Sequence, residues 1–314
     1  MARMREFIHE LPKAELHLHL EGSLEAETLI EMDPTLSMEE VRDAYQFEDF
    51  GGFLRSYVWV SKRLARPDDY AIATRHLLQR LTAQNVKYVE LNLSVGVILW
   101  KEQHFEAIFR AIRQETWQSP VEVHWIFDAV RQFGRDHVRC VAELAVEHAC
   151  DGVIGFGIGG DEKRGPAEEF IDIFEFTKAN GLASLPHSGE TTTPEAMWQT
   201  LKLKPDRIGH GIAAAEDPEL MRHLRDNNIP LEVCITSNIC TGAVPSLDGH
   251  PVRKLFDAGV PITLNTDDPA MFKTSLEHEY EIAAERFGFS DAELQQIADN
   301  GFRYGMICYP KKSA

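Results

Sequence analysis

The chain has 314 residues, of which 44% are hydrophobic and 9% aromatic, so a large apolar core is available and global disorder is not expected. Its formal net charge of −18 makes a nucleic-acid polymer an unfavourable partner, because the phosphates would meet an acidic surface. The five cysteines form no C-x-x-C pair, no apolar run is long enough to cross a membrane, and no cleavable leader precedes the first strand pattern. We therefore expect a cytoplasmic protein without disulfides and without a membrane partner.

Strand-like and helix-like segments alternate along the chain. Residues 68–85 carry an apolar stripe at helical spacing, and a similar pattern over 167–181 ends in Gly181, a typical helix stop. Strands separated by helices indicate parallel βαβ units, and eight such units fit a (β/α)₈ TIM barrel of the α/β class. The alternative is an open doubly wound sheet, but no G-x-G-x-x-G motif follows the first strand. The eight predicted strands cover residues 14–20, 86–94, 121–129, 152–158, 182–187, 207–211, 230–235 and 261–266.

One segment interrupts this alternation. Residues 25–67 contain helical patterns and no good strand. The segment follows the first predicted strand, at the end of a barrel where active-site loops are found. We therefore predict one barrel domain over residues 1–314, with residues 25–67 inserted as a helical lid over its mouth.

Two histidines stand one residue apart in the first predicted strand, "ELHLHLEG". Because side chains alternate along a strand, His17 and His19 point to the same face. Such a pair could simply find hydrogen bonds on a half-buried strand. However, His187 ends the fifth predicted strand and Asp267 follows the eighth, and both lie where barrel enzymes hold their chemistry. The four side chains together predict a metal site, with zinc favoured and another first-row divalent metal as the alternative.

A metal-bound water at such a site becomes a strong nucleophile near neutral pH, and a proton donor is then needed close by. Glu190 lies three residues after His187, beyond a Ser-Gly turn, and can reach the same cavity. The alternative for Glu190 is a carboxylate in the first turn of a helix, stabilised by the helix dipole. Two further polar residues, His210 and Asp268, also stand at the ends of predicted strands.

The motifs "ELHLHLEGSL", "HSGE", "RIGHG", "TSN" and "LNTDDPAMF" follow one another in this order. Together they resemble the adenosine/adenine deaminase branch of the metal-dependent amidohydrolases, over about residues 8–306. The resemblance implies a zinc-dependent hydrolytic deaminase with a single Zn²⁺, which converts the 6-amino group of an adenine nucleoside into a 6-oxopurine and ammonia. No zinc-deaminase motif of the H-x-E…P-C-x-x-C type, which often acts on polynucleotides, is present.

The resemblance also implies a role for each site residue. The metal ligands would be His17, His19, His187 and Asp267. Glu190 would protonate purine N1, His210 would orient the attacking hydroxide, and Asp267 would also accept a proton from the attacking water. The remaining matches are substrate contacts, namely Asp268 to purine N7, the Gly160 backbone to purine N3, and Glu21 at the position that binds the ribose 5′-hydroxyl.

Two departures bear on the substrate. Glu21 stands where many adenosine deaminases carry Asp, and Gly157 stands where they usually carry Asp. The expected substrate is therefore adenosine or a 5′-modified adenosine, and the alternatives are aminodeoxyfutalosine, an adenosine with a benzoate-bearing 5′ group, and adenine. The segment 51–67 could serve such a 5′ group through aromatic and basic side chains, although a solvated helix face would explain them equally. These side chains are Phe53, Arg55, Tyr57, Trp59, Lys62, Arg63 and Arg66.

Two other classes of function stay open at this stage. One is a different metal hydrolase on the same barrel, since a fold does not fix a reaction. The other is a purine-binding protein without catalysis, which would not need Glu190. We expect a small-molecule purine nucleoside as the partner, and the protein could also form a homo-oligomer.

Overall fold

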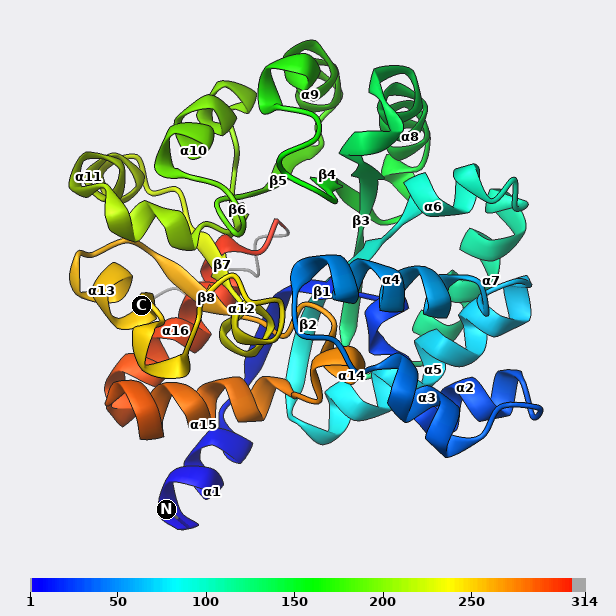
Figure 1. Ribbon diagram of the computed structural model, residues 1–314, viewed down its shortest axis with the longest axis horizontal. Coiled ribbons are helices and arrows are strands. Elements are labelled where there is room, and N and C mark those ends of the chain that lie inside the picture. Colours follow the sequence, from blue (N-terminus) through cyan, green and yellow to red (C-terminus); the bar gives the residue numbers. More distant parts are fainter. Residues whose placement is uncertain (1, 307–314) are drawn as a thin grey trace.

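The computed structural model describes residues 2–306, and its centre is a barrel of eight parallel strands (Figure 1). The strands pair in chain order, and a bridge between Leu18 and Asp267 joins the last strand's end to the first strand. The predicted (β/α)₈ barrel is thus confirmed. The strands are β1 (Lys13–His19), β2 (Val86–Leu93), β3 (Glu122–Val130), β4 (Val153–Gly159), β5 (Ala183–Ser188), β6 (Ile208–His210), β7 (Leu231–Val233) and β8 (Ile262–Leu264).

Helices surround the barrel, and the helix predicted over 68–85 is α5 (Pro67–Ala83). The helix predicted over 167–181 is α9 (Ile171–Ala179), which begins only at Ile171. Residues 167–170 form a 3₁₀ turn instead, which places the buried side chains of Ala167 and Phe170 above one another. The other helices are α1 (Ala2–Glu10), α2 (Ala26–Met32), α3 (Met38–Ala44), α4 (Phe50–Ser61), α6 (Val95–Trp100), α7 (Phe105–Thr116), α8 (Arg135–Glu147), α10 (Pro194–Thr200), α11 (Pro218–Asp226), α12 (Ile235–Cys240), α13 (Val252–Asp257), α14 (Pro269–Phe272), α15 (Leu276–Phe287) and α16 (Asp291–Tyr304).

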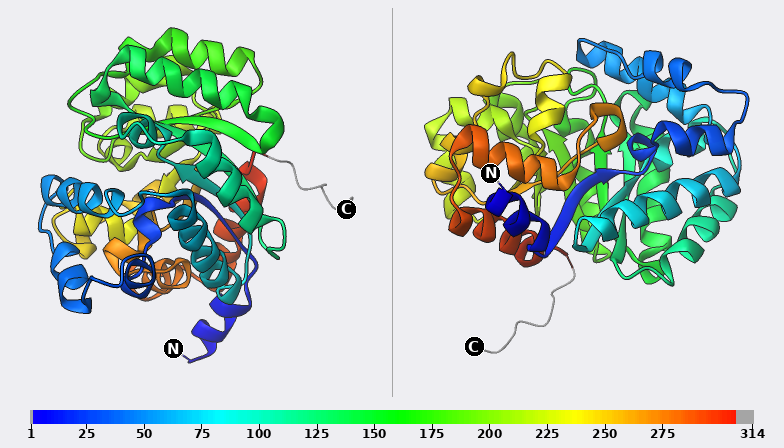
Figure 2. Two further views of the ribbon diagram at one scale, coloured as in Figure 1. Left: turned by 90° about the vertical axis from the view of Figure 1, so that its right-hand side faces the viewer. Right: turned by 90° about the horizontal axis from the view of Figure 1, so that it is seen from below.

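The segment between β1 and α5 forms the helices α2, α3 and α4, as its pattern predicted. Figure 2 shows these helices, in blue, standing out from one side of the barrel. A capping box between Ser37 and Glu40 starts α3, and the Asp49 carboxylate starts α4 by accepting the Gly52 amide hydrogen. Helix α4 also reaches the barrel, where the Tyr57 hydroxyl lies 2.7 Å from the Ser94 hydroxyl. The place of this segment as a lid stays a prediction.

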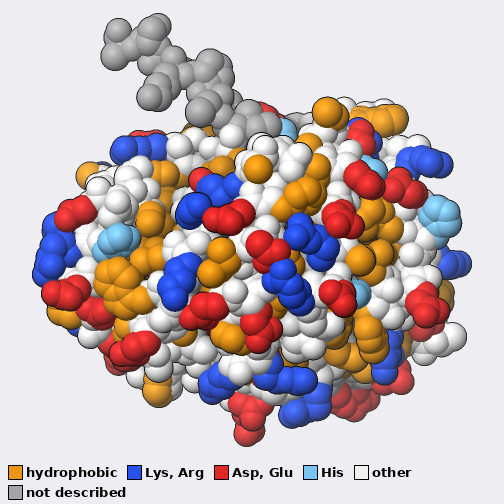
Figure 3. Space-filling view, turned by 90° about the horizontal axis from the view of Figure 1, so that it is seen from above, with side chains coloured by type: hydrophobic (Ala, Val, Ile, Leu, Met, Phe, Trp, Pro, Cys, Tyr) orange, Lys and Arg blue, Asp and Glu red, His pale blue; other side chains and the backbone are white. Residues whose placement is uncertain are grey.

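The surface and the cysteines bear on the expected partners. Figure 3 shows acidic and basic side chains interspersed over the face seen from above, without a broad basic patch on that face. Four described cysteines, Cys140, Cys150, Cys234 and Cys240, are free thiols, and Cys308 lies outside the described residues. Within residues 2–306, no helix is both long and apolar enough to cross a membrane.

The barrel interior is unusually polar. All seven residues of β1 are buried, and the side chains that alternate with Ala14, Leu16 and Leu18 are Lys13, Glu15, His17 and His19. Ala14, Leu16 and Leu18 belong to apolar clusters, so this strand presents its apolar face to the core and its polar face to a network of hydrogen bonds.

A buried ion network crosses the barrel interior at one level. Arg207, just before β6, pairs with Glu90 of β2 and places its Nε 2.5 Å from Oε1 of Glu232 of β7. Its Nη1 also donates to the Tyr304 carbonyl, 2.7 Å away at the end of α16. Arg207 and Glu90 are fully buried and Glu232 is 4% exposed at its side chain. Since buried charges are tolerated only when paired, this network holds two sides of the barrel together.

We predict that Arg207→Leu lowers the free energy of unfolding by about 3–5 kcal/mol, because Glu90 and Glu232 would stay buried without a cation. Urea unfolding of both proteins measures this difference. The matched control is Arg225→Leu, since Arg225 pairs with Asp226 on the exposed surface and its loss should cost at most about 0.5 kcal/mol. Equal losses in the two variants would contradict the role of the network.

Candidate active site

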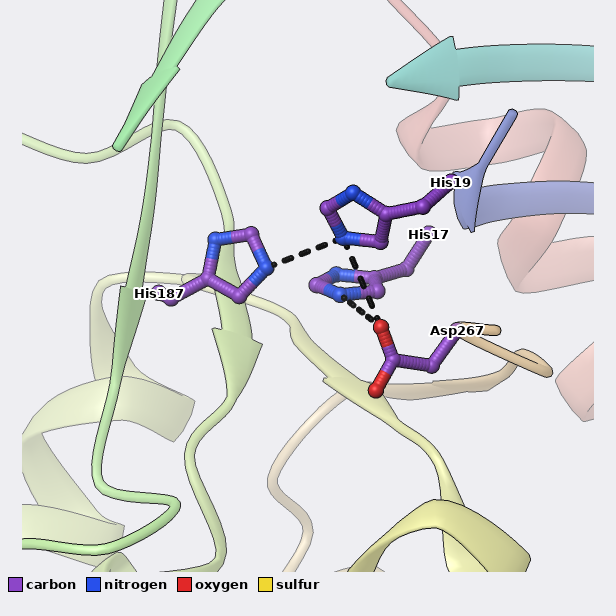
Figure 4. A group of neighbouring side chains, drawn as sticks. All are labelled: His17, His19, His187 and Asp267. Atoms are coloured by element: carbon purple, nitrogen blue, oxygen red, sulfur yellow. Dashed lines mark hydrogen bonds and ion pairs between the residues drawn. The ribbon is translucent and has the colours of Figure 1, made fainter. Parts of the chain in front are cut away.

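Four side chains from three separate segments of the chain meet at the mouth of the barrel (Figure 4). His17 and His19 come from β1, His187 from β5, and Asp267 from the loop after β8. The Nε2 atoms of His19 and His187 lie 3.3 Å apart, and Oδ1 of Asp267 lies 3.4 Å from Nε2 of both His17 and His19. The structure thus brings together the four residues that the sequence singled out as metal ligands.

These four residues fit a divalent metal ion by their chemistry. One ligand atom from each of them falls within 4.8 Å of all the others. Nε2 of His17 is buried and has no hydrogen-bond partner, as expected of an atom aimed at an ion. Burial also lowers the pKa of His19 to about 4, so its imidazole is neutral and can offer a lone pair. Three imidazole nitrogens with one carboxylate oxygen are typical donors to zinc and to other first-row divalent metals.

Two further residues orient the candidate ligands. Oε2 of Glu232 lies 2.8 Å from Nδ1 of His17, so Nδ1 donates its hydrogen there and Nε2 is the nitrogen that would face a metal. Burial would lower the pKa of His17, but the carboxylates of Asp267 and Glu232 raise it to about 10, so a metal ion would displace a proton from Nε2. Burial would raise the pKa of Glu232, but the charge of Arg207 and the hydrogen bond from His17 lower it below its usual value. The Ser237 hydroxyl donates to Oδ2 of Asp267 at 2.7 Å, which leaves Oδ1 to face the histidines.

The backbone is strained at two of the site residues. His210 and Asp267 have φ values of +60° and +65°, in the left-handed region that residues other than glycine rarely adopt. Such a conformation costs about 1–3 kcal/mol and persists only when the surroundings hold it. For Asp267 the surroundings are β1, because its amide donates to the His17 carbonyl at 3.1 Å and its carbonyl accepts from the His19 amide at 2.8 Å.

Two glycines leave room for site side chains. A Cβ atom at Gly22, in "HLEGS", would lie 1.7 Å from Oδ1 of Asp268. A Cβ atom at Gly209, in "RIGHG", would lie 2.7 Å from the His17 ring. Real Cβ atoms do not come so close, so the absence of a side chain at these positions is what lets Asp268 and His17 take their places.

Glu190 is held in place by another carboxylate, Glu162. The backbone amides of Gly189, Glu190 and Thr191 donate to the two oxygens of Glu162 at 2.7–3.0 Å. Burial would raise the pKa of Glu162, but hydrogen bonds from Thr192 and these amides, together with the charge of Arg131, lower it. Glu162 was not among the predicted site residues, although it stands in the "GGDE" motif that contains Gly160.

The pKa of Glu190 is shifted in the opposite direction to that of Glu162. Burial raises its pKa well above the usual value, and the negative charges of Asp267 and Glu162 raise it further. Both effects favour the protonated form of this carboxyl group. Its Oε2 lies 3.8 Å from Nε2 of His210, which in turn lies 3.9 Å from Oδ2 of Asp267. A proton donor and the candidate metal ligands thus face the same space.

That space is a cavity of about 260 Å³. The candidate ligands His19, His187 and Asp267 line it, and so do Glu190, His210, Asp268 and Gly160. The rest of the wall is largely apolar, and its apolar part comes from Phe50, Phe53, Leu54, Tyr57 and Val58 of α4 and from Val97, Val130 and Phe133. Ser94, Asp128, Gln132, Gly159 and Glu162 also line it. Pockets of this kind, apolar with a few convergent polar groups, are typical of small-molecule sites.

Glu21, a predicted substrate contact, and Asp128, which the sequence did not single out, both lie at or beside this cavity. Glu21 does not line the cavity, and its carboxylate accepts hydrogen bonds from the Ser94 amide at 3.1 Å and from the Tyr57 hydroxyl at 3.3 Å. Asp128 of β3 does line it, and its Oδ1 is buried without a partner. A Cβ atom on Gly157, its neighbour on β4, would lie 2.6 Å from this oxygen. A side chain at position 157 would therefore clash with Asp128 where this carboxylate lies now.

The basic residues of segment 51–67 do not line this cavity. Arg63 stacks on the Trp59 ring at 3.3 Å, and Arg66 pairs with Asp69 at the start of α5. Arg55 and Arg63 line a separate, open groove beyond α4, together with Trp59. The possibility that these cations contact a 5′ group of the substrate is therefore not supported by their positions.

Known proteins are similar to this chain over nearly its whole length. The family described as adenosine deaminase matches residues 12–314. An aminodeoxyfutalosine deaminase of Streptomyces coelicolor is 35% identical, with 99% of this chain and 84% of the relative covered. An adenine deaminase of Rhizobium leguminosarum is 37% identical, with 91% and 92% covered. Among solved structures, an amidohydrolase from Burkholderia ambifaria with bound zinc superimposes with a TM-score of 0.90 at 25% identity, over 98% of this chain and 89% of that one.

We predict that Glu232→Gln weakens zinc binding by about 10- to 100-fold, because His17 loses the carboxylate that orients it. Competition with a chromogenic zinc chelator measures the affinity without any substrate. The matched control is Glu90→Gln, which removes a charge from the same Arg207 network but leaves the partner of His17 in place. Equal weakening in both variants would show that loss of stability, and not the orientation of His17, controls metal affinity.

Proposed function

Because the chain belongs to the adenosine deaminase family, and is accordingly a hydrolytic deaminase acting on purines, we propose that its substrate is an adenine nucleoside with a 5′ extension. The products would be the 6-oxopurine nucleoside and ammonia, and the metal would be zinc. One observation carries the proposal: Glu190, whose pKa burial raises well above its usual value, and a group of three histidines and one aspartate face the same cavity, whose remaining wall is largely apolar. Aminodeoxyfutalosine is the specific candidate.

The candidate metal ligands and the polar residues beside them would each have a role in the reaction. When bound, the metal ion would supply a water that ionises near neutral pH. Glu190 would donate its proton to purine N1, which makes C6 susceptible to addition of the water oxygen. Asp267 would accept the proton that this water releases and pass it to the 6-amino group, which leaves as ammonia. As the C6–N bond breaks, the hydroxyl on C6 becomes the 6-oxo group, and its proton would return to the Glu190 carboxylate. His210 would hydrogen-bond to the attacking oxygen.

The base would be oriented by two further contacts. Burial and the charge of Asp267 raise the pKa of Asp268 well above its usual value, so this carboxyl group carries a proton. A protonated Asp268 can donate a hydrogen bond to purine N7, which is an acceptor. Gly160, which lines the cavity in a turn with φ +92°, would offer its backbone N–H to purine N3.

The apolar wall supports a 5′ extension. Phe50, Phe53 and Leu54 of α4 would be left against a polar sugar or water if the substrate were plain adenosine or adenine. An aromatic 5′ group would cover them and gain about 25 cal/mol for each Å² of apolar surface removed from water. Among residues 2–306, no Lys or Arg lines this cavity, which argues against a 5′-phosphate.

A carboxylate at the far end of such a 5′ group could leave the apolar wall through the neighbouring cavity. Phe50 and Glu190 line both cavities, and Lys163 and Lys254 line only the second. Lys163 is exposed, and it follows the Gly160 turn closely in sequence. We propose it as the cation that faces the benzoate of aminodeoxyfutalosine.

The second candidate substrate is adenine, and it rests on the relatives alone. The adenine deaminase from Rhizobium leguminosarum is as similar in sequence as the aminodeoxyfutalosine deaminase from Streptomyces coelicolor. Adenine would use the polar end of the cavity and leave the apolar wall uncovered.

We predict that zinc-loaded protein prefers aminodeoxyfutalosine over adenosine and adenine by at least tenfold in kcat/KM, about 1.4 kcal/mol of transition-state preference. Ammonia release and the change in purine absorbance measure all three rates side by side. In Lys163→Ala, KM should rise for aminodeoxyfutalosine and stay unchanged for adenosine. A preference for adenine would overturn the 5′ extension, and no turnover of any purine would overturn the substrate class as a whole.

We also predict that Glu190→Gln lowers kcat by about 10²- to 10⁴-fold, because the amide cannot donate a proton to N1 as an acid does. Binding of the product nucleoside, followed by calorimetry, should change little. The control is Glu195→Gln, at an exposed position close by in α10, which should keep full activity. A purine-binding protein without catalysis would show no turnover before the substitution either.

A further inference from the structure

A chain of hydrogen bonds runs from His210 away from the candidate metal ligands, through Asn238 of α12, to His250. Nδ2 of Asn238 lies 3.2 Å from Nδ1 of His210, and Oδ1 of Asn238 lies 3.1 Å from Nε2 of His250. The chain ends at the backbone, where the Val252 amide lies 3.2 Å from Nδ1 of His250. All three side chains are buried, with 1%, 0% and 4% of their surface exposed.

The far end of this chain fixes the direction of every hydrogen bond in it. A backbone amide can only donate, so Nδ1 of His250 must accept and Nε2 of His250 must carry the hydrogen of the neutral ring. That hydrogen needs an acceptor, which places the Asn238 oxygen toward His250 and the Asn238 amide group toward His210. Nδ1 of His210 must then accept, and the hydrogen of the neutral His210 ring lies on Nε2.

The fold supplies the fixed end of this chain from a helix terminus. Val252 is the first residue of α13, so its amide has no acceptor within the helix. His250 satisfies that amide, and burial lowers the pKa of His250 to about 3, so the ring stays neutral. A neutral His250 keeps one donor and one acceptor nitrogen, as the direction of the chain requires.

The direction matters because of what Nε2 of His210 faces. It lies 3.8 Å from Oε2 of Glu190 and 3.9 Å from Oδ2 of Asp267, on the side of the ring that lines the cavity. In the tautomer with hydrogen on Nε2, the ring offers a hydrogen-bond donor to an oxygen that gains negative charge there. In the other tautomer it would offer a lone pair, which repels such an oxygen.

We propose that Asn238 and His250 are positioning residues that hold His210 in the tautomer with hydrogen on Nε2, so that His210 acts as a hydrogen-bond donor in the cavity. The catalytic consequence rests on the proposed deamination, whereas the tautomer itself does not. Neither Asn238 nor His250 lines the cavity of His210, and neither contacts the reacting atoms.

The substitution Asn238→Asp keeps the shape of the side chain but replaces the donor that faces Nδ1 of His210 with an acceptor. One oxygen of the Asp carboxylate still accepts a hydrogen bond from Nε2 of His250. The other oxygen now faces Nδ1 of His210 and favours the tautomer in which Nδ1 carries the hydrogen. We expect kcat for the deamination to fall by about 10²- to 10³-fold, as for the loss of a preorganised donor, with KM changed less than threefold.

The direct readout is nitrogen NMR of zinc-loaded protein labelled with ¹⁵N-histidine, with the His210 signals assigned through His210→Asn. At about pH 9, well above the ordinary imidazole pKa of about 6.5, the native protein should show hydrogen on Nε2 of His210 and Asn238→Asp should show it on Nδ1. This measurement needs no substrate, so it stays decisive even if the proposed substrate is wrong. Urea unfolding checks that the variant is folded.

Two comparisons make the result specific. Asn227→Asp is the matched control, because Nδ2 of Asn227 lies 3.4 Å from Nδ1 of His223 on the exposed surface, and this variant should keep both kcat and the His210 tautomer. His250→Gln should preserve most of kcat, since a side-chain amide can still donate to Asn238, whereas His250→Leu should lose it. If Asn238→Asp leaves hydrogen on Nε2 of His210, the proposal is overturned, even if kcat falls.

Discussion

The architecture of the site depends on the carboxylate of Glu232, which is shared between two buried partners. One of its oxygens lies 2.5 Å from Nε of Arg207 and the other 2.8 Å from Nδ1 of His17. The first contact makes it possible to keep an ionised carboxylate inside the barrel, and the second uses that carboxylate to aim a candidate metal ligand. Because Arg207 also binds Glu90 and the Tyr304 carbonyl, the orientation of His17 is tied to opposite sides of the barrel and to the end of α16. The buried ion network and the orientation of a candidate metal ligand are thus coupled through this one group.

The same interior holds carboxyl groups in both protonation states, and their partners decide which. Glu162 and Glu232 face backbone amides, hydroxyls or arginines, so their pKa values are lowered despite burial. Glu190 and Asp268 have few such partners and lie near the charge of Asp267, so their pKa values are raised. The proposed deamination would use both kinds, since charged groups would hold the loops and the metal ligands while neutral groups would donate hydrogen to the purine ring. The separation follows from the number of donors around each carboxyl group, since all four are almost completely buried.

Similarity to the relatives does not identify the substrate of this chain. Relatives named as aminodeoxyfutalosine deaminase and as adenine deaminase are similarly close to this chain, so residues common to the chemistry do not separate them. What can differ is the wall that α4 places against the cavity, where Phe50, Phe53 and Leu54 make an apolar surface. A helical segment inserted after the first strand can change this wall without disturbing the barrel that holds the reactive groups.

The sequence by itself determined the alternation of strands and helices, and with it the barrel. It also determined that His17 and His19 share a face, because side chains on a strand repeat every two residues. The carboxyl ends of parallel strands meet at one end of a barrel, so the sequence predicts that His187, His210 and Asp267 lie close together. Only the tertiary structure decided contacts between distant segments that no local period encodes. The Glu21 carboxylate accepts hydrogen bonds from Ser94 and Tyr57, and Asp128 lies over Gly157. Arg63 and Arg66, which follow α4, have partners outside the cavity. The direction of the hydrogen bonds at His210 likewise depends on a helix terminus 42 residues further along the chain, at Val252, whose position follows only from packing.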